Sequence, residues 1–397
     1  MARVCMVLFN DYSWDPRVRR EAEALVERGD TVHCICLGSK KLTCLEGVRL
    51  FCFPGKKYQG ANPFWLLMDY LQFFCYAFLK VAFLHLKKPY DIVQAHTMPD
   101  FLVFTALIPK LLGARVILDI HDLMPELYVA KFSSRHGKWI VKFITWVERR
   151  SVAFADKTIA VHKPHLDALT EHGNPAAKFS VLLNVPDHRI FKRQRPARRQ
   201  PDKFRLIYHG TLPQRAGVDV ALRAVARART EIPHLELHVV GGGEGLEHLT
   251  QLVQDLNLAN CVEFTPPVPV EKLPAIIARA DVGVIPYLSD VFTQYVLPTK
   301  LLEYAAVGIP AIVTRLRTVE WYFDADMVAY CEPGNDIDLA AQIVRLYRNP
   351  DLALGLASNA ARFTDTFNWA QHRQIYFRLV DSLLPARGVF ANSESKG

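Results

Sequence analysis

Residues 297–310 read LPTKLLEYAAVGIP, and this stretch decides the fold of the 397-residue chain. It follows a short apolar run of the buried-strand type, Val282–Ile285, and an irregular loop. Pro298 and Thr299 suit the start of a helix, and the closing Gly-Ile-Pro ends it. A helix that begins there presents free N–H groups and the positive end of its dipole, which suits a diphosphate. Glu303, one turn in, can accept hydrogen bonds from ribose hydroxyls, or it is simply a surface carboxylate on a capped helix.

Apolar runs typical of buried strands alternate with segments of helical spacing on both sides of this stretch. In the second half these runs are Phe204–Tyr208, Leu235–Val240, Val262–Phe264, Val282–Ile285 and Ala311–Val313, with a helix from about Val218. In the first half they are Val4–Phe9, Thr31–Leu37, Val48–Phe53, Asp91–Ala95, Arg115–Asp119 and Lys157–Val161, with a helix from Arg17 to Arg28. The pattern predicts an α/β protein with two Rossmann-like, doubly wound parallel-sheet domains facing a cleft. Ligands should bind on the loops that follow the strands.

The net charge of +8 is concentrated in the first half and in residues 188–203. This basic segment also holds two prolines, so we expect it to link a first domain of residues 1–187 to a second domain of residues 204–366. An amphipathic helix over 367–387 follows. The positive charge favours anionic partners such as phosphates or lipid headgroups, unless it serves solubility alone. Because no zinc-finger spacing, RRM signature or aromatic–basic stripe occurs, nucleic acid is not expected as a partner.

Composition excludes several classes of protein. With 50% hydrophobic and 22% charged residues, the chain has enough apolar material for sizeable cores and is not intrinsically disordered. No uncharged apolar run reaches the roughly 18 residues that cross a bilayer, and the first residues do not form a secretory signal. The eight cysteines include no C-x-x-C pair, which fits a reducing cytosol better than a disulfide framework.

Residues 64–86 are unusually rich in Phe, Trp, Tyr and Leu. Their polar residues Asp69, Gln72 and Lys80 recur at near-helical spacing and would form one narrow stripe beside a wide apolar face. This pattern predicts a helix that lies in the plane of a membrane surface. The alternative is an ordinary helix of the first domain that is buried over most of its surface.

Two glycine-containing loops precede residues 297–310. Residues 208–217 read YHGTLPQRAG, where Gly210 and Gly217 allow a backbone to approach a phosphate and Arg215 can supply a bidentate contact. The alternative is a plain turn with a solvated arginine. Residues 241–245 read GGGEG, an incomplete form of the dinucleotide-binding pattern that is weak by itself.

Together these loops resemble the nucleotide-binding domain of GT-B glycosyltransferases, specifically the family-4 group, and the resemblance extends over nearly the whole chain. In the first half it rests on Asp15–Ala22, His96–Asp100, Asp119–Glu126 and Asn184–Asp187. The match is closest to bacterial members that build lipid-linked or surface polysaccharides. The resemblance implies a GT-B fold, a UDP- or GDP-linked sugar donor, transfer with retained anomeric configuration, and neither metal nor other cofactor. It also implies that the helix over 367–387 packs back on the first domain.

The resemblance assigns donor-binding residues motif by motif. Glu303 matches the ribose-binding glutamate of the family, and Pro298 and Thr299 match the loop whose amides hold the diphosphate. The donor-binding set is completed by Gly210, Thr211, Gly243 and Glu244. Thr211 stands where the family commonly has arginine, and Tyr295 stands where it often has a first glutamate.

The resemblance and the local chemistry assign the remaining roles. His121 matches the histidine at the cleft edge of the first domain. Arg215 lies near the usual basic position, and Lys300 is the candidate that replaces the missing charge. These three are the expected catalytic residues: Arg215 and Lys300 would stabilise charge that develops on the departing diphosphate, and His121 would hydrogen-bond the donor sugar or stabilise developing charge. The candidates that orient the acceptor hydroxyl are Asp15, Asp100, Asp122 and Glu126, each of which could instead cap a helix or pair with an arginine.

The sequence thus predicts a hexosyl- or N-acetylhexosaminyltransferase that acts on a lipid-linked or polysaccharide-precursor acceptor. We expect it in the cytoplasm, peripheral on the inner face of the plasma membrane, with residues 64–86 on the membrane. Two alternatives are a sugar-nucleotide 2-epimerase of the same fold and an inactive sugar-nucleotide-binding protein. Asp324-Ala-Asp326 spells D-x-D, but it is expected to be a turn, and His162, His165 and His172 lack a matching metal-ligand set.

Overall fold

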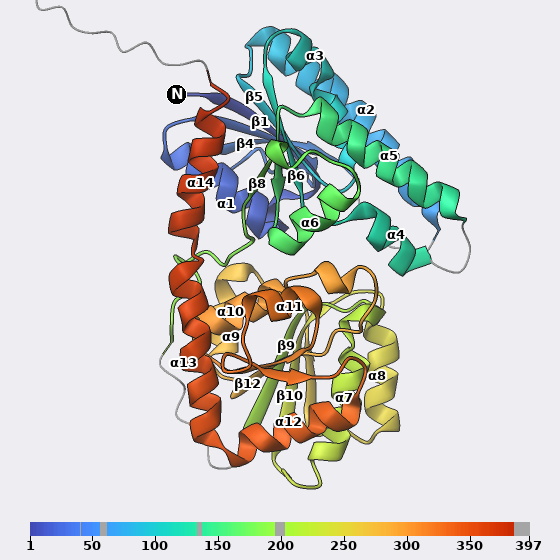
Figure 1. Ribbon diagram of the computed structural model, residues 1–397, viewed down its shortest axis with the longest axis vertical. Helices are drawn as coiled ribbons and strands as arrows, with labels where there is room; N and C mark the ends of the chain where they lie inside the picture. The colour runs from blue at the N-terminus through green and yellow to red at the C-terminus, as the bar shows by residue number, and fades with distance from the viewer. Residues whose placement is uncertain (40, 56–61, 133–136, 195–202, 385–397) are drawn as a thin grey trace, which may run out of the picture.

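The computed structural model describes residues 1–39, 41–55, 62–132, 137–194 and 203–384. Two separate sheets, each with helices on both faces, form two domains one above the other in Figure 1. This is the predicted α/β architecture of two doubly wound domains. The predicted strands are present with bounds shifted by at most a few residues, because their apolar runs are buried on both faces of each sheet.

The first sheet has the strand order β3-β4-β2-β1-β5-β6-β7-β8 and is parallel except for the β3–β4 pair. Its strands are β1 (Arg3–Asp11), β2 (Thr31–Leu37), β3 (Cys44–Leu45), β4 (Val48–Phe53), β5 (Ile92–His96), β6 (Arg115–Ile120), β7 (Lys157–Ala160) and β8 (Phe179–Val181). The helices of this domain are α1 (Pro16–Glu27), α2 (Pro63–Lys87), α3 (Leu107–Leu111), α4 (Met124–Phe132), α5 (Lys138–Phe154) and α6 (Lys163–Glu171), with a 3-10 segment η2 (Asp100–Ala106).

The second sheet is fully parallel in the order β11-β10-β9-β12-β13-β14. Its strands are β9 (Phe204–Thr211), β10 (Leu235–Gly242), β11 (Val262–Thr265), β12 (Val282–Ile285), β13 (Ala311–Thr314) and β14 (Ala329–Cys331). The helices are α7 (Val218–Ala228), α8 (Leu246–Asp255), α9 (Leu273–Ile277), α10 (Thr299–Val307), α11 (Arg317–Tyr322), α12 (Asp336–Arg348), α13 (Pro350–Thr366) and α14 (Trp369–Asp381). A 3-10 segment, η4 (Gln214–Ala216), precedes α7.

Helix α2 covers the predicted residues 64–86. One stripe of its apolar residues is buried against the domain, and its other apolar residues are exposed. Tyr70, Phe73, Ala77 and Val81 are buried in the core of the first domain. The helix therefore packs on the sheet as an ordinary domain helix does, while the rest of its apolar surface stays open. In the part of the chain that the structure describes, Phe64–Lys87 is also the single helix long and apolar enough to cross a membrane, and 22% of its most apolar window is buried.

The last described helix, α14, leaves the second domain and returns to the first. In Figure 1 it runs upward from α13 to lie beside α1. Tyr376, Leu379 and Val380 join the same core cluster as the buried residues of β1. Arg28 of α1 pairs with Asp381 at 2.8 Å, and this ion pair ties the two helices together.

Candidate active site

A cavity of about 390 Å³ lies between the two domains and is lined by both. The first domain contributes the loop after β1, the loop after β6 and the start of α6. The second domain contributes the loop before α10 and the first turn of that helix. The lining residues among the predicted ones are Asp15, His121, Asp122, Pro298 and Thr299.

Helix α10 begins at this cavity, as the stretch 297–310 predicts. Pro298 is its N-cap residue, and no side chain caps the helix. The N–H groups of a first helical turn have no partners within the helix, so they remain available to an anion. Leu301 N–H already donates to the Pro298 carbonyl at 3.0 Å, which leaves the amides of Thr299 and Lys300 as the ones that face a ligand.

The ammonium of Lys300 lies behind the loop after β9. It donates to the hydroxyls of Tyr208 at 3.0 Å and Tyr287 at 3.1 Å, and the side chain is buried. Burial disfavours the charge, but the two hydroxyls outweigh it and hold the pKa of Lys300 above its usual value. A Cβ at Gly210 would lie 3.3 Å from Lys300 Nζ, so glycine lets the charge approach the exposed loop. Lys300 lines neither interdomain cavity, and its positive charge is fixed next to Gly210 at the end of β9.

Glu303 is held by a residue that the sequence patterns do not single out. His209, at the carboxyl end of β9, is hydrogen-bonded through Nε2 to the Glu303 carboxylate, and its other ring nitrogen contacts the Tyr304 hydroxyl at 3.1 Å. The carboxylate of Glu303 is therefore oriented before any ligand arrives. Thr299 and Glu303 also line a smaller cavity of about 110 Å³ next to Arg20 and Asn184.

The donor-binding glycines gather where β9 and β10 end side by side. Gly210 pairs in register with Gly241, and Thr211 pairs with Gly242. Gly243 and Glu244 follow in the exposed loop before α8. These predicted residues lie on one edge of the sheet, as expected for parallel strands.

In the loop after β9, the expectation for Gly217 needs correction, and Arg215 lies outside both cavities. Gly217 serves backbone packing rather than a phosphate, because a Cβ there would lie 1.8 Å from the Pro286 carbonyl oxygen. Its φ of +64° also favours glycine. Arg215 does not line either interdomain cavity; its guanidinium lies 5.4 Å from the centre of the Phe292 ring.

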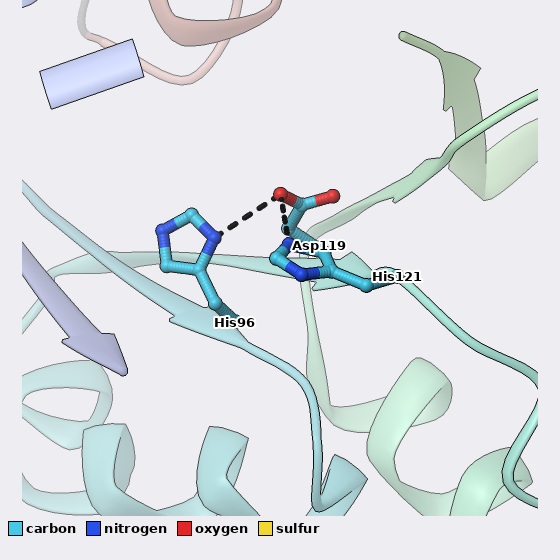
Figure 2. Close-up of side chains that lie close together, drawn as sticks. All are labelled: His96, Asp119 and His121. Atoms are coloured by element: carbon cyan, nitrogen blue, oxygen red, sulfur yellow. Dashed lines mark hydrogen bonds and ion pairs between the residues drawn. The ribbon is translucent and has the colours of Figure 1, made fainter. Parts of the chain in front are cut away.

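On the opposite wall, His121 is oriented by a buried carboxylate (Figure 2). Its Nε2–H donates to Asp119 Oδ2 at 2.9 Å, and His96 Nδ1–H donates to the same oxygen at 3.1 Å. Arg17 grips both oxygens of Asp119, at 2.8 and 2.9 Å. Although burial raises the pKa of Asp119, Arg17 and His121 hold it well below its usual value. The Nδ1 atom of His121 is then left to face a ligand.

The atoms of His96, Asp119 and His121 that could bind a metal lie within 4.8 Å of one another. However, Arg17 already occupies both carboxylate oxygens. A divalent cation would have to displace this buried positive charge. The cluster therefore fits a hydrogen-bonded histidine better than a metal centre.

The four predicted acceptor-side carboxylates separate into two groups. Asp15 and Asp122 line the cavity, and Asp15 also caps α1 by accepting from Val18 N–H at 3.1 Å. Asp100 and Glu126 line neither interdomain cavity, contrary to expectation. Asp100 is buried at the start of η2.

Glu126 is occupied by an ion pair away from the cavity. Its carboxylate contacts His172 Nε2 at 3.0 Å, and Glu148 contacts the other ring nitrogen at 3.0 Å. It therefore ties α4 to the end of α6. The sequence patterns include Glu126 in a loop motif but do not reveal this distant partner.

Arg17, Asp119 and His209 contact candidate site residues, but the sequence analysis does not select them. Each of the three lies in a motif segment that the sequence analysis quotes. Each is also buried, in a strand or helix whose other buried residues are mostly apolar. A charged or imidazole side chain in an otherwise apolar strand would have found Asp119 and His209, while Arg17, in the first turn of α1, carries no such signal.

Comparisons with known proteins agree with this geometry. Residues 17–189 match the family model described as Glycosyltransferase Family 4, and residues 203–349 match the one described as Glycosyl transferases group 1. A GDP-mannose-dependent alpha-(1-6)-phosphatidylinositol monomannoside mannosyltransferase of Mycolicibacterium smegmatis is 33% identical over 37% of this chain and 39% of its own length. A D-inositol 3-phosphate glycosyltransferase of Corynebacterium jeikeium is 29% identical over 45% of this chain and 43% of its own. The alignments thus span less than half the length of these relatives.

Solved structures share the fold over almost the entire chain. Sucrose-phosphate synthase from Thermosynechococcus elongatus has a TM-score of 0.76 at 19% identity, covering 96% of this chain and 99% of that one. Anabaena HepE in complex with UDP-glucose has a TM-score of 0.73 at 16% identity, covering 96% and 100%. One family model matches each half of the chain, and the chain therefore belongs to the family-4 glycosyltransferases and has their two-domain GT-B fold.

Proposed function

We propose that the protein is a retaining glycosyltransferase that moves a sugar from a UDP- or GDP-linked donor to a hydroxyl group. One observation carries the proposal: the open N-terminus of α10 and the oriented His121 face each other across one cavity. The first suits a diphosphate and the second suits the reacting sugar. The relatives' names support nucleotide-sugar chemistry, with GDP-mannose in one and UDP-glucose in another.

In this proposal the donor lies along α10. The amides of Thr299 and Lys300 hold the diphosphate, and Glu303 accepts hydrogen bonds from the ribose. When the anomeric bond breaks, negative charge grows on the diphosphate, and the Lys300 ammonium with the helix dipole stabilises it. The acceptor oxygen bonds to the anomeric carbon from the same face that the diphosphate leaves, while a phosphate oxygen takes the acceptor proton, so the anomeric configuration is retained. Neither a protein nucleophile nor a metal or other cofactor is required by this scheme.

We propose further that the acceptor is a lipid-linked or polysaccharide precursor and that the enzyme is peripheral on the cytoplasmic face of the membrane. The exposed apolar side chains of α2 support this, among them Phe64, Trp65, Leu71, Leu79 and Phe83. Helix α5 adds exposed Trp139, Phe143 and Trp146. Both helices pack on η2 and run side by side in Figure 1. Lysines and arginines such as Lys142 and Arg150 accompany these aromatics, as anionic lipids favour.

A thermal-shift panel of nucleotides tests the donor site. Stabilisation by a ligand scales as RT ln(1 + [L]/Kd), so the matching diphosphate should raise the melting temperature above that given by other bases. The sugar nucleotide that carries the matching base should then release free nucleoside diphosphate when the enzyme and acceptor lipids are added. Because the scheme requires no metal, EDTA should not prevent this release. Absence of stabilisation by UDP, GDP and their sugars would contradict the proposal.

Flotation with liposomes tests the membrane site. Replacement of Trp139 and Trp146 by serine should abolish binding to vesicles that contain anionic lipid. Trp321→Ser, on α11 of the second domain, is the matched control, because Trp321 is equally exposed but lies outside the α2–α5 surface. Equal binding by all variants would refute membrane attachment through α5.

The rival activities give different products. Incubation with UDP-GlcNAc alone yields product only for a 2-epimerase, since a transferase needs an acceptor. An inactive sugar-nucleotide-binding protein would be stabilised by the nucleotide but would turn over no sugar nucleotide, whichever acceptor is added. The exposed α2–α5 surface favours the transferase, because an epimerase of soluble sugar nucleotides needs no membrane surface.

A further inference from the structure

A continuous chain of buried polar groups leads from α14 to His121. The Tyr376 hydroxyl donates to Gln94 Oε1 at 2.7 Å, and the Gln94 amide donates to Glu21 Oε2 at 2.8 Å. Glu21 Oε1 lies 3.4 Å from Arg17 Nε. Arg17 in turn grips Asp119, which accepts from His121. Five consecutive contacts thus connect α14, the last described helix, to the cavity.

Because these polar groups are buried, loss of any one contact in the row would cost folding free energy. Tyr376, Gln94, Glu21 and Asp119 are each 0% exposed. Buried polar groups need partners, and a charge in such a place needs a specific one. A core that required only packing would use apolar side chains here, so the chain has a role beyond filling space.

Glu21 is the member that controls the charge balance. Burial and then the nearby Asp119 raise the pKa of Glu21 to about 7, while Arg17 opposes them. One guanidinium therefore serves two carboxylates. The charged or polar groups that surround Glu21 are Arg17 and Arg20 of α1, Gln94 and His96 of β5, Asp119 of β6 and Tyr376 of α14. Whatever pulls Arg17 toward Glu21 weakens its hold on Asp119.

We propose that Tyr376, Gln94 and Glu21 are positioning residues for His121, so that docking of α14 on the first domain sets the orientation of the cavity histidine. Tyr376 fixes the Gln94 amide, the amide holds Glu21, and Glu21 shares Arg17 with Asp119. The strength of Asp119 as an acceptor for His121 Nε2–H then depends on whether α14 is in place. The catalytic meaning of this arrangement rests on the proposed function, but the arrangement itself does not.

The first test therefore needs no activity. In isotope-labelled protein at pH 8, the ring N–H proton of His121, assigned with His121→Gln, reports its hydrogen bond to Asp119. Glu21→Gln frees Arg17 for Asp119 and should move this signal upfield, and Tyr376→Phe should move it in the same direction by less. Glu171→Gln removes a carboxylate charge at an exposed position of α6, and Tyr330→Phe removes a hydroxyl that donates to Phe323 in the second domain. Both controls should leave the signal unchanged.

The second test measures transfer rate. Tyr376→Phe should lower kcat about three- to tenfold while KM for the nucleotide sugar stays constant, because the donor site on α10 is untouched. Tyr330→Phe should change neither constant. A His121 signal identical in wild type, Glu21→Gln and Tyr376→Phe overturns the inference even if the enzyme is active. Loss of the signal shift and loss of transferase activity are thus separate failures.

Discussion

Single side chains in this site are placed by partners distant in the sequence. Glu303 is oriented by His209, Lys300 by Tyr208 and Tyr287, and these partners come from β9 and the loop after β12. Such pre-orientation lowers the entropy that a ligand must lose on binding. Binding affinity at this site should therefore respond sharply to small chemical changes.

Glu303→Gln should weaken nucleotide binding about 10- to 100-fold, because a charged hydrogen-bond acceptor for the ribose becomes a neutral amide. Isothermal titration with the preferred nucleoside diphosphate measures the change. Glu320→Gln is the control, since Glu320 pairs with Arg315 on an exposed surface of the same domain. Equal affinities for wild type and Glu303→Gln would remove this residue from the donor site.

At the residue scale, the start of α10 could be predicted from the sequence, whereas the partners of the candidate site residues could not. The stretch 297–310 gives Pro298, Thr299 and Glu303 through helix-start chemistry that is local in sequence. Asp119 depends on Arg17, which is distant along the chain, and no local pattern encodes that pairing. For the same reason the isolation of Glu126 from the cavity could not be foreseen.

Elements of the first domain are joined by an ion-pair bridge. His172, at the end of α6, lies between Glu126 of α4 and Glu148 of α5. Burial alone would lower the pKa of His172, but the two carboxylates outweigh it and raise it to about 10. A histidine whose pKa is higher in the folded state stabilises that state most when it is protonated.

Stability of the first domain should therefore fall as the pH rises. The contribution of His172 is complete below its unfolded pKa of about 6.5 and is lost as the pH passes through about 10. In urea unfolding, the free energy of unfolding of the wild type should exceed that of His172→Gln by roughly 1–3 kcal/mol at pH 6 and by much less at pH 10. His188→Gln, at an exposed position, should show no such trend. A difference from wild type that is constant with pH would contradict the bridge.

Helix α10 is seated directly on a glycine of the neighbouring strand. A Cβ at Gly283 of β12 would lie 2.3 Å from the Tyr304 ring of α10. The helix that presents the donor site can approach the sheet only because this side chain is absent. Packing of strand against helix thus sets the position of the site.

Gly283→Ala should destabilise the second domain by about 1–3 kcal/mol, because the ring must move or the helix must lift. It should also weaken nucleotide binding, since α10 moves with Tyr304. Gly355→Ala in α13 is the control: nothing lies within 4 Å of a Cβ there, and alanine favours a helix. Thermal melts with and without nucleotide measure both effects, and a Gly283→Ala protein that melts like wild type would exclude the contact.

At the element scale, the apolar strands of four or more residues were predictable, and the strands of two or three residues were not. β3, β8 and β14 have two or three residues each and lie at or next to sheet edges, so they lack a buried run. The apolar character of α2 was clear from sequence, but its division into a buried stripe and an open face depends on η2 and the sheet beneath it. Hydrophobic periodicity cannot distinguish a protein neighbour from a lipid one.

At the scale of the whole molecule, α14 follows the second domain in sequence but completes the core of the first domain. Leu379 and Val380 pack in the cluster that includes Val4 and Met6 of β1. The two-domain architecture was predictable because the strand–helix pattern starts again after the basic segment. That α14 returns to the first domain followed from the family resemblance, since amphipathicity does not name the surface that a helix covers.

Leu379→Ala should destabilise the first domain by about 2–5 kcal/mol while leaving the second domain unaffected. Hydrogen exchange should accelerate in β1 and β2 but not in β9 and β10. Leu354→Ala is the control, because Leu354 is an exposed leucine of α13. Faster exchange confined to the second domain would show that α14 belongs there energetically.

This closing helix has a consequence for biosynthesis. During translation β1 leaves the ribosome early, but Leu379 and Val380, which pack against it in the core, are synthesised near the end of the chain. At about 5–20 residues per second, the first domain, whose last strand ends at Val181, waits roughly 10–40 s with part of its interior uncovered. Trigger-factor-like chaperones that shield apolar nascent chains would then engage this domain for longer than the second, although it is translated first.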